Sequence, residues 1–377
     1  MRALVTGGAG LIGSHIVDLL LHEGWHVRVL DNLEPQTHRD GAPDWLAPAA
    51  QFVRGDVRDR TTMETALQDI DVVFHEAAYG GYMPEIAKYV AVNSFGTAQL
   101  LEIIRDRNLP IRKVIVASSQ AVYPEGSISC RVHGVLHPPV RALERLRRGD
   151  FSVPCPVCGA TTTPVATPED APLDGQTVYA LTKVDQERLA LMWGRQTGIP
   201  TIALRYSCTY GPRQSIFNPY TGGIAIFCTR LLNGMAPILY EDGAQTRDFS
   251  FVEDVACANL AVALSDQLDG RAVNVGSGRA VTIRELAQHL ASGLGVSIEP
   301  IVSGEFRPGE MRDLRSDTTL LSSIGHTAHV SLDAGIASYF QWIRTRVDVR
   351  EYFTDAAAAL RGKGIVQRVA GANSGAA

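Results

Sequence analysis

The stretch TGGAGLIGSH, from Thr6 to His15, decides the fold that this sequence predicts. It spaces Gly7, Gly10 and Gly13 three residues apart, directly after a strand-like run and at the start of a helix-like run. Glycines at such a turn let a pyrophosphate approach the backbone, and the following helix offers unpaired N–H groups and the positive end of its dipole. A tight turn without a ligand is the alternative, but the position at the head of a βαβ unit favours a dinucleotide site.

The end of the second strand-like run indicates which dinucleotide would bind. Asp31 stands there, followed by Asn32, Leu33 and Glu34. A carboxylate at this place can accept hydrogen bonds from both ribose hydroxyls and would repel a 2′-phosphate. Because no arginine or lysine follows immediately, the sequence predicts NAD rather than NADP. Without the glycine turn, Asp31 would be an ordinary solvated strand end.

Short β-branched runs alternate with longer amphipathic runs in the first half of the chain, which is typical of βαβ units and a parallel sheet. The predicted strands are Arg2–Thr6, His26–Leu30, Gln51–Arg54, Val72–His75, Lys113–Ala117 and Thr201–Arg205. The predicted helices between them are Leu11–Glu23, Thr61–Gln68, Pro84–Arg105 and Val178–Arg195. Three later helices, Gly222–Asn233, Val252–Ser265 and Ile283–Ser292, are assigned to a smaller second lobe.

The length of 377 residues exceeds what a single hydrophobic core usually serves. We therefore predict an α/β fold: a Rossmann-type, doubly wound parallel sheet with a smaller α/β substrate-binding lobe and a small insertion. The dinucleotide domain would cover residues 1–125 and 173–210, the insertion 126–172, and the second lobe 211–361, with part of the chain crossing back. Residues 362–377, rich in Gly, Ala and Ser, are predicted to be a flexible tail.

The composition excludes several classes of protein. With 45% hydrophobic and 20% charged residues, the chain has the make-up of an ordinary globular protein. A net charge of −5 provides no basic field for a nucleic-acid backbone. No apolar run approaches the roughly 20 residues that span a bilayer, so we expect a cytoplasmic protein without membrane contact. The six cysteines lack the pattern of a small secreted scaffold, so we expect no structural disulfides.

A tyrosine and a lysine on one predicted helix suggest the chemistry. Tyr179 and Lys183 are four residues apart and share a helix face. A tyrosine loses its proton near about pH 10, so it needs a neighbouring cation to act as a base at neutrality, and Lys183 would supply that charge. An isolated Y-x-x-x-K is usually a solvated helix face. Here, however, the preceding strand ends in Ser118 and Ser119, at the sheet edge where open α/β folds bind ligands.

Together these motifs resemble the extended short-chain dehydrogenase/reductase family, in its NAD-dependent nucleotide-sugar epimerase/dehydratase branch. The resemblance covers nearly the whole chain. It rests on TGGAGLIGSH, Asp31-Asn32, GDVRD around Asp56, HEAA (75–78), Asn93, SSQAVY (118–123), YALTK (179–183), RYSCTYGP (205–212), DGAQTRDF (242–249) and RPGE (307–310). It implies that Ser119, Tyr179 and Lys183 are the catalytic residues.

The resemblance also implies which residues would bind the two ligands. Those for NAD are Gly7, Gly10, Leu11, Ile12, Gly13, Asp31, Asn32, Asp56, Val57, Ala77, Ala78, Tyr79, Asn93, Ala117, Ser118, Tyr179, Lys183 and Tyr206. Those for a nucleotide-diphosphate sugar are Gly80, Gln120, Cys208, Asn218, Arg247, Asn274, Arg307 and Glu310. Arginine forks suit phosphate oxygens, although each arginine could instead form a surface ion pair.

Two departures from the family pattern stand out. Dehydratases of this branch carry an acidic pair immediately after the catalytic hydroxyl residue, whereas Gln120 and Ala121 stand there in this chain. Elimination of water would therefore lack its acid and base. Cys208 occupies a position where relatives often carry an asparagine near the diphosphate.

Four residues of the insertion have the spacing of a zinc ribbon. Cys130 and His133 precede Cys155 and Cys158 by about twenty residues. Four such ligands would complete a tetrahedral, structural zinc site, which would fold a segment too small for a core of its own. His137 could replace His133, and unrelated free thiols are the alternative because only one C-x-x-C is present.

The insertion, FNPYTGG (217–223) and EIAKY (85–89) are most similar to dTDP-L-rhamnose 4-epimerases. This resemblance implies 4-epimerisation of a nucleotide sugar through a transient 4-keto intermediate, and a homodimer. Two alternatives within enzymes are a UDP-glucuronate-type epimerase or decarboxylase and a net nucleotide-sugar oxidoreductase. An alternative of another class is a non-catalytic NAD-binding module that engages a partner through the zinc ribbon.

Overall fold

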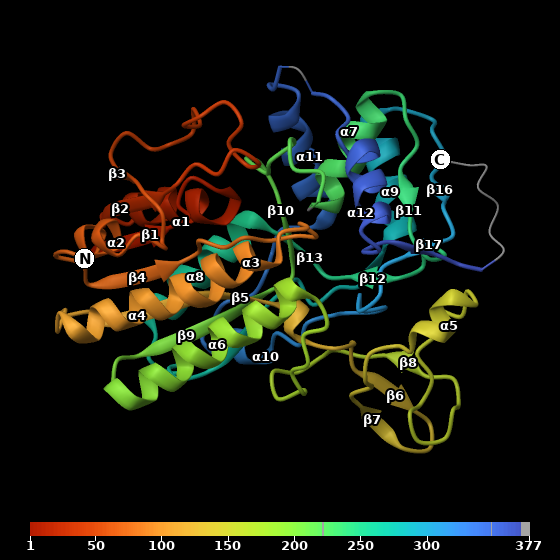
Figure 1. Cartoon of the computed structure of the whole chain (residues 1–377), viewed down its shortest axis with the longest axis horizontal. Helices are drawn as coiled ribbons and strands as arrows, with labels where there is room; N and C mark the ends of the chain where they lie inside the picture. Colours follow the sequence, from red (N-terminus) through yellow and green to blue (C-terminus); the bar gives the residue numbers. More distant parts are fainter. Residues whose placement is uncertain (221, 348, 371–377) are drawn as a thin grey trace.

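Seven parallel strands form the central sheet of the computed structural model, which describes residues 1–220, 222–347 and 349–370 (Figure 1). From one edge to the other, the strands are β14 (Ala272–Val275), β9 (Thr201–Tyr206), β5 (Lys113–Ser119), β4 (Val72–His75), β1 (Arg2–Thr6), β2 (His26–Asp31) and β3 (Gln51–Arg54). The strand order reverses next to β1, because the chain runs outward through β2 and β3 and then returns to β4 on the other side. This topology confirms the predicted Rossmann-type fold, and it opens a crevice at the carboxyl ends of β1 and β4.

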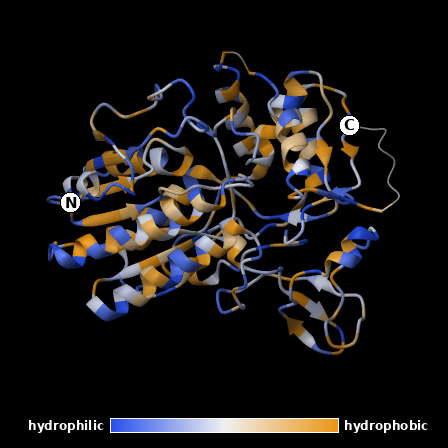
Figure 2. Ribbon diagram, in the orientation of Figure 1, coloured by the Kyte–Doolittle hydropathy of each residue, from blue (hydrophilic) through white to orange (hydrophobic). Residues whose placement is uncertain are grey.

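Helices cover both faces of the sheet, because alternate residues of each buried strand point to opposite sides. Ala3 and Val5 of β1 pack with α1 (Leu11–His22), α8 (Val252–Leu264) and α10 (Thr319–Ser323). Leu4 packs on the other face with α2 (Arg60–Ala66), α4 (Gly96–Asp106) and α6 (Val178–Thr197). In Figure 2 the hydrophobic residues concentrate in the strands and along these helices.

The predicted helix Pro84–Arg105 is interrupted by a wider turn. The structure has α3 (Ile86–Tyr89), a π-helical segment (Val90–Phe95) and then α4. A π segment inside a helix often marks a functional site, since it aims one side chain differently. Here that segment carries Asn93.

The second lobe is built from helices and short strand pairs. Its helices are α7 (Gly223–Leu232), α9 (Ile283–Leu294), α11 (Leu332–Ile343) and α12 (Phe353–Gly362). Its strands are β10 (Cys208–Tyr210), β11 (Ile238–Leu239), β12 (Thr246–Arg247), β13 (Phe249–Phe251), β15 (Val281–Thr282) and β16 (Ile301–Val302). The helices pack mainly around one core that contains Tyr210, Leu286 and Tyr339.

The prediction that the helix Val252–Ser265 belongs to this lobe is wrong. That helix is α8, whose Val255, Ala258 and Val262 pack in the core beneath the central sheet beside α1. β14 follows it and pairs in parallel with β9. α8 and β14, together with α10, are the part of the chain that crosses back.

The insertion forms a small module beside the second lobe (Figure 1). Its antiparallel sheet consists of β6 (Ile128–Cys130), β7 (Gly134–Leu136) and β8 (Thr163–Pro164), and it carries α5 (Leu143–Arg147). A short 3₁₀ turn, Gln120–Val122, leads from β5 toward it.

The predicted flexible tail is wrong for residues 362–370. β18 (Gln367–Arg368) pairs antiparallel with β17 (Glu305–Phe306), and the Ala370 N–H donates to the carbonyl of Arg147. The remainder of that predicted tail, residues 371–377, lies outside the described residues. Among the described residues, none of the helices combines the length and apolar character that crossing a bilayer requires.

Candidate active site

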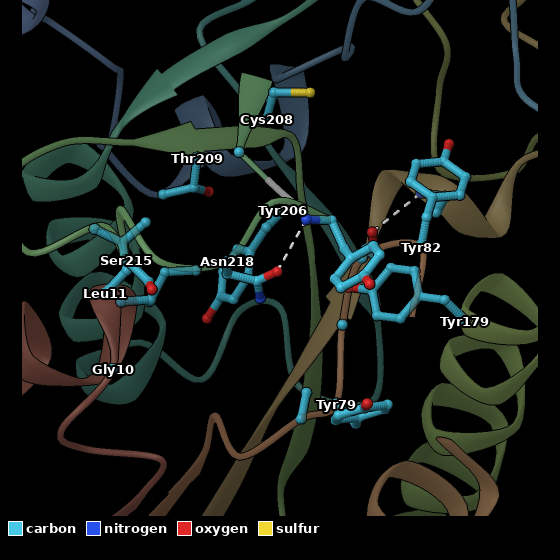
Figure 3. A pocket seen from close by; sticks show the side chains of 18 of the residues that line it. Gly10, Leu11, Tyr79, Tyr82, Tyr179, Tyr206, Cys208, Thr209, Ser215 and Asn218 are labelled. Atoms are coloured by element: carbon cyan, nitrogen blue, oxygen red, sulfur yellow. Dashed lines mark hydrogen bonds between the residues drawn. The ribbon is translucent and has the colours of Figure 1, made fainter. Parts of the chain in front are cut away.

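A cavity of about 640 Å³ opens at the carboxyl ends of the central strands, between the sheet and the second lobe. Every residue predicted to touch NAD or substrate lines this cavity except Asn93 and Asn274. In Figure 3, Gly10 and Leu11 lie on one side of the cavity, and Tyr79, Tyr82 and Tyr179 lie on the other. Residues from distant parts of the sequence therefore meet in one space that is large enough for ligands.

The glycine turn has the shape that a phosphate cradle requires. Gly7 adopts φ +68°, and a Cβ there would lie 2.8 Å from the backbone of Ala77. A Cβ on Gly13 would collide with the carbonyl oxygen of Gly7. The helix that follows begins at Leu11 without a side-chain cap, so its first N–H groups are available to an anion. The residues present therefore fit the pyrophosphate of a dinucleotide.

Two carboxylates lie beside this turn. Asp31 accepts hydrogen bonds from the Ala9 N–H (3.0 Å) and the Leu33 N–H (2.8 Å). Asp56 accepts from the Asn32 side chain (2.9 Å), and a hydrogen bond from Arg58 lowers the pKa of Asp56 to about 2. Both side chains line the cavity, where two negative charges disfavour an additional phosphate on the ribose.

The three predicted catalytic residues converge from β5 and α6. Ser119 ends β5, and α6 starts with a cap in which the Thr177 hydroxyl accepts from the Ala180 N–H. Burial raises the pKa of Tyr179, and a hydrogen bond with Ser119 opposes that shift. Lys183 donates from Nζ to the Ala117 carbonyl (2.6 Å) and to Gln186 Oε1 (2.7 Å).

Lys183 lies close to Tyr179 and is held by hydrogen bonds of its own. Its Nζ lies 6.0 Å from the centre of the Tyr179 ring and is already committed to two acceptors. Burial also lowers the pKa of Lys183 to about 8, although the nearby Glu76 opposes this. The role of Lys183 in lowering the pKa of Tyr179 stays a prediction, and a further cation in the cavity would act in the same direction.

Glu76 is a cavity residue that the sequence analysis missed, although it quoted the HEAA motif. The Glu76 carboxylate accepts a hydrogen bond from the Tyr206 hydroxyl (2.9 Å). Burial raises the pKa of Glu76 to about 7. The HEAA motif does not indicate the buried state of Glu76, because the partner of its carboxylate, Tyr206, lies far away in the sequence.

The opposite end of the cavity carries Arg247, which is buried, and Arg307, which is partly buried, rather than two surface ion pairs. Arg247 Nη2 lies 3.0 Å from Glu310 Oε1, and Arg307 Nη1 lies 3.6 Å from Glu310 Oε2. The Arg307 guanidinium is stacked between the rings of Tyr82 (3.9 Å) and Tyr240 (4.6 Å). Neither tyrosine was predicted, since each meets Arg307 only in the folded chain.

Several buried polar atoms in this cavity have no hydrogen-bond partner among the described residues. They are Gln120 Oε1, Gln214 Oε1, Tyr240 OH, Gln245 Oε1 and Arg307 Nε. Because an unpaired buried polar atom is costly, this group of atoms is suited to a polar ligand. Such an arrangement fits the sugar and phosphate groups of a nucleotide sugar.

Two predicted contact residues lie outside the cavity lining. Asn93 accepts from the Tyr79 N–H (2.8 Å) and donates to Thr182 (3.0 Å), so it holds a lining residue in place. Asn274 was predicted to contact substrate, but it does not line the cavity. Its side chain accepts from the Tyr123 hydroxyl (2.8 Å) and donates to the carbonyl of Thr167 (2.9 Å), which ties β14 to the base of the insertion.

The four predicted metal ligands gather at one point of the insertion. Cys130 Sγ lies 3.7 Å from His133 Nδ1 and 3.9 Å from Cys158 Sγ, and Cys155 Sγ lies 3.5 Å from His133 Nδ1. All four ligand atoms lie within 4.8 Å of one another. Sulfurs bound tetrahedrally to one zinc ion are separated by about 3.8 Å, so the donor set fits. His137, the alternative to His133, is not part of this cluster, and its Nδ1 lies 2.8 Å from Ser127 Oγ.

This fold and cavity agree with a family model. The NAD-dependent epimerase/dehydratase family matches residues 3–140 and 152–276, and the chain belongs to that family. The resemblance inferred from the motifs is thereby confirmed.

Individual members of this family are similar to the chain over most of its length. The dTDP-L-rhamnose 4-epimerase of Burkholderia thailandensis is 32% identical over 354 residues, covering 92% of this chain and 96% of its own. The UDP-glucose 4-epimerase of Thermotoga maritima, solved with UDP-glucose, is 29% identical with a TM-score of 0.75, covering 91% of this chain and 99% of its own. That of Thermus thermophilus, solved with NAD, is 29% identical with a TM-score of 0.73, covering 92% of this chain and 100% of its own.

Proposed function

We propose that this protein is an NAD-dependent nucleotide-sugar 4-epimerase, with a dTDP-L-rhamnose-like sugar as its substrate class. The observation that carries the proposal is the meeting of Ser119 and Tyr179 with the glycine cradle in one cavity. The names of the relatives support it, since they include 4-epimerases of both dTDP and UDP sugars.

Tyr179 and Ser119 have separate roles in the proposed reaction at carbon 4 of the sugar. Tyr179 takes the proton of the 4-hydroxyl, and Ser119 stabilises the oxygen on which charge develops. NAD supplies the reversible hydride acceptor for carbon 4 and, when oxidised, the positive charge that favours the phenolate of Tyr179. The cavity, at about 640 Å³, would leave a keto sugar room to turn and present its opposite face to the cofactor. Tyr179 then gives back the proton, so no net oxidation occurs.

The residues after Ser119 argue against a dehydratase. Gln120 lines the cavity and donates from Nε2 to Cys208 Sγ (3.0 Å), and Ala121 has no ionisable group. Neither can serve as the acid or base that elimination of water requires. The same hydrogen bond from Gln120 involves Cys208, the residue that departs from the family pattern of an asparagine near the diphosphate.

A structural zinc ion in the insertion is part of the same proposal. Cys130, His133, Cys155 and Cys158 would hold it in a closed coordination shell. Hydrogen bonds from the backbone of Val132 and His133 lower the pKa of Cys130 to about 6, which favours the thiolate that a metal binds. A closed shell makes a structural ion rather than a catalytic one.

A homodimer is a further part of the proposal. Exposed apolar side chains gather on the helices that cover one face of the sheet: Ile86 on α3, Val90 and Phe95 in the π segment, and Leu181 and Met192 on α6. A self-complementary patch of this kind suits a two-fold contact with a second copy. We also propose a cytoplasmic location, which the six free cysteines support.

The decisive experiment is NMR analysis of the product from dTDP-L-rhamnose, UDP-glucose and UDP-glucuronate, with absorbance at 340 nm followed in parallel. We expect inversion at carbon 4 of at least one sugar without lasting NADH. Lasting NADH accumulation would instead indicate a net oxidoreductase, and loss of the carboxyl group a decarboxylase. Inactivity on every sugar, with NAD bound, would leave only the non-catalytic module.

A further inference from the structure

A buried ion cluster joins the insertion to the rest of the molecule. Arg141, between β7 and α5, has a side chain that is only 4% exposed. It pairs with Glu125 (Nε–Oε2, 3.1 Å) and makes a two-pronged contact with Glu241 (3.0 and 2.9 Å). Its remaining hydrogen bonds go to the carbonyls of Phe151 (3.2 Å) and Glu310 (2.7 Å). All five N–H donors of this guanidinium are therefore used, which a lysine could not reproduce.

The cluster makes hydrogen bonds to the backbone of residues 310–313, which follow β17. Arg141 holds the Glu310 carbonyl, and Glu125 Oε1 accepts from the N–H groups of Arg312 and Asp313. The Arg312 side chain adds a contact to Glu241 (2.7 Å). The backbone of residues 310–313 is thus fixed from the insertion side by groups that are all buried or nearly so.

The same segment carries the arginine contacts of the cavity. The main chain of Glu310 touches Arg141, while its carboxylate touches Arg247 and Arg307. Those two guanidiniums line the cavity, and Arg307 has an unpaired buried Nε. A continuous set of contacts therefore runs from the insertion to the groups that face a ligand.

We propose that Arg141 is a positioning residue through which the insertion sets Arg247 and Arg307 for binding the diphosphate of the substrate. The proposal rests on the proposed function only for the identity of that ligand, a nucleoside diphosphate group. Arg141 itself does not line the cavity, so it acts through the backbone of Glu310.

A purely structural role would have a different signature. Burying charges is expensive, and loss of one member of a buried pair strongly lowers the stability of the folded state. If stability were the only consequence, the folded fraction of a variant would bind ligand normally. A positioning role requires weaker binding by molecules that are folded.

The test compares Arg141→Lys with wild type and with Arg145→Lys. Arg145 is a matched control, because it lies in the same insertion and pairs with Asp150 inside it. We measure the Kd of dTDP and UDP by calorimetry, NAD content, the melting temperature, and KM and kcat. In Arg141→Lys we expect Kd and KM to rise about tenfold or more, with kcat within about twofold of wild type and unchanged NAD content. Arg145→Lys should match wild type.

A second variant protects the test against misfolding. Glu241→Gln keeps the shape and one of the two acceptor oxygens while it removes the charge and the second prong of the contact, and it should raise Kd in the same direction by a smaller factor. Unchanged Kd and KM in folded Arg141→Lys would overturn the proposal, as would an equal rise in Arg145→Lys. If neither Arg141→Lys nor Glu241→Gln changes Kd while both lower the melting temperature, the cluster is structural only. Failure of the proposed function looks different, since wild type would then bind dTDP or UDP but epimerise no sugar.

Discussion

At the scale of single residues, the cavity holds ionisable groups away from their ordinary state. Burial raises the pKa of Tyr179, lowers that of Lys183 to about 8 and raises that of Glu76 to about 7. The protein alone thus keeps the phenol protonated. A cation bound beside Tyr179 would oppose this shift and favour the phenolate that the proposed function requires.

Replacement of Tyr179 by Phe removes the proposed base and little else, because the ring and its packing remain. We expect kcat to fall by roughly 10²–10⁴-fold, the usual contribution of a general base, with NAD content close to wild type. Steady-state kinetics on the epimerised sugar checks this. Tyr352→Phe, outside the cavity lining, is the control. A near-normal kcat in Tyr179→Phe would remove Tyr179 from the mechanism.

Glu76 should make stability depend on pH in a defined direction. Its pKa is raised by burial from 4.5 to about 7 in the folded state, so the folded state prefers the protonated form. This contribution to stability is complete below about pH 4.5 and is lost as pH rises through about 7. When the pH is raised from 5 to 8, we therefore expect the melting temperature of Glu76→Gln to fall by less than that of wild type. Parallel pH profiles for the two proteins would contradict the assignment.

At the scale of elements, the insertion has too few buried apolar residues to be stable by packing alone. Its sheet is three short strands, and Val132, Val135 and Val157 are exposed. A metal would provide the missing free energy of folding. The module is thus expected to depend on its ligands more than on its core.

Substitution of one ligand should release the metal and loosen the module. In Cys155→Ser we expect elemental analysis to show loss of about one zinc per chain and limited proteolysis to cut within residues 126–172 faster than in wild type. Cys257→Ser, on α8, is the matched control. Equal metal content in both variants and wild type would show that the four side chains hold no zinc.

At the scale of the whole molecule, two lobes enclose the cavity and one helical face remains apolar. That face includes Leu181, exposed by 60%, and Phe95, exposed by 51%. Exposed apolar side chains of this kind suit the proposed contact with a second copy of the chain.

Charges placed on that face should separate the copies. For Phe95→Glu combined with Leu181→Lys, light scattering after size exclusion should give the mass of one chain, compared with two for wild type. Leu264→Lys is the control, because Leu264 is equally exposed but lies on α8, on the other face of the sheet. A wild-type protein that already runs as a monomer would refute the dimer.

The sequence predicted the local parts of this molecule well and the distant pairings poorly. The six strands and the glycine turn follow from residue periodicity and from glycine geometry, which act within a few residues. The membership of α8 in the sheet domain, the pairing of β18 with β17 and the inward placement of Asn274 were missed or wrong. Each of these depends on a partner far along the chain.

Residue spacing was enough to predict the kind of fold, the glycine turn and the clustering of Cys130, His133, Cys155 and Cys158, because spacing along a strand, helix or turn sets which side chains share a face. Folding was needed to show that Lys183 donates to the Ala117 carbonyl, that Glu76 is surrounded by protein and that Arg141 donates to the Glu310 carbonyl. The reason is physical: burial and charge pairing are properties of the surroundings, and a side chain's surroundings exist only after folding.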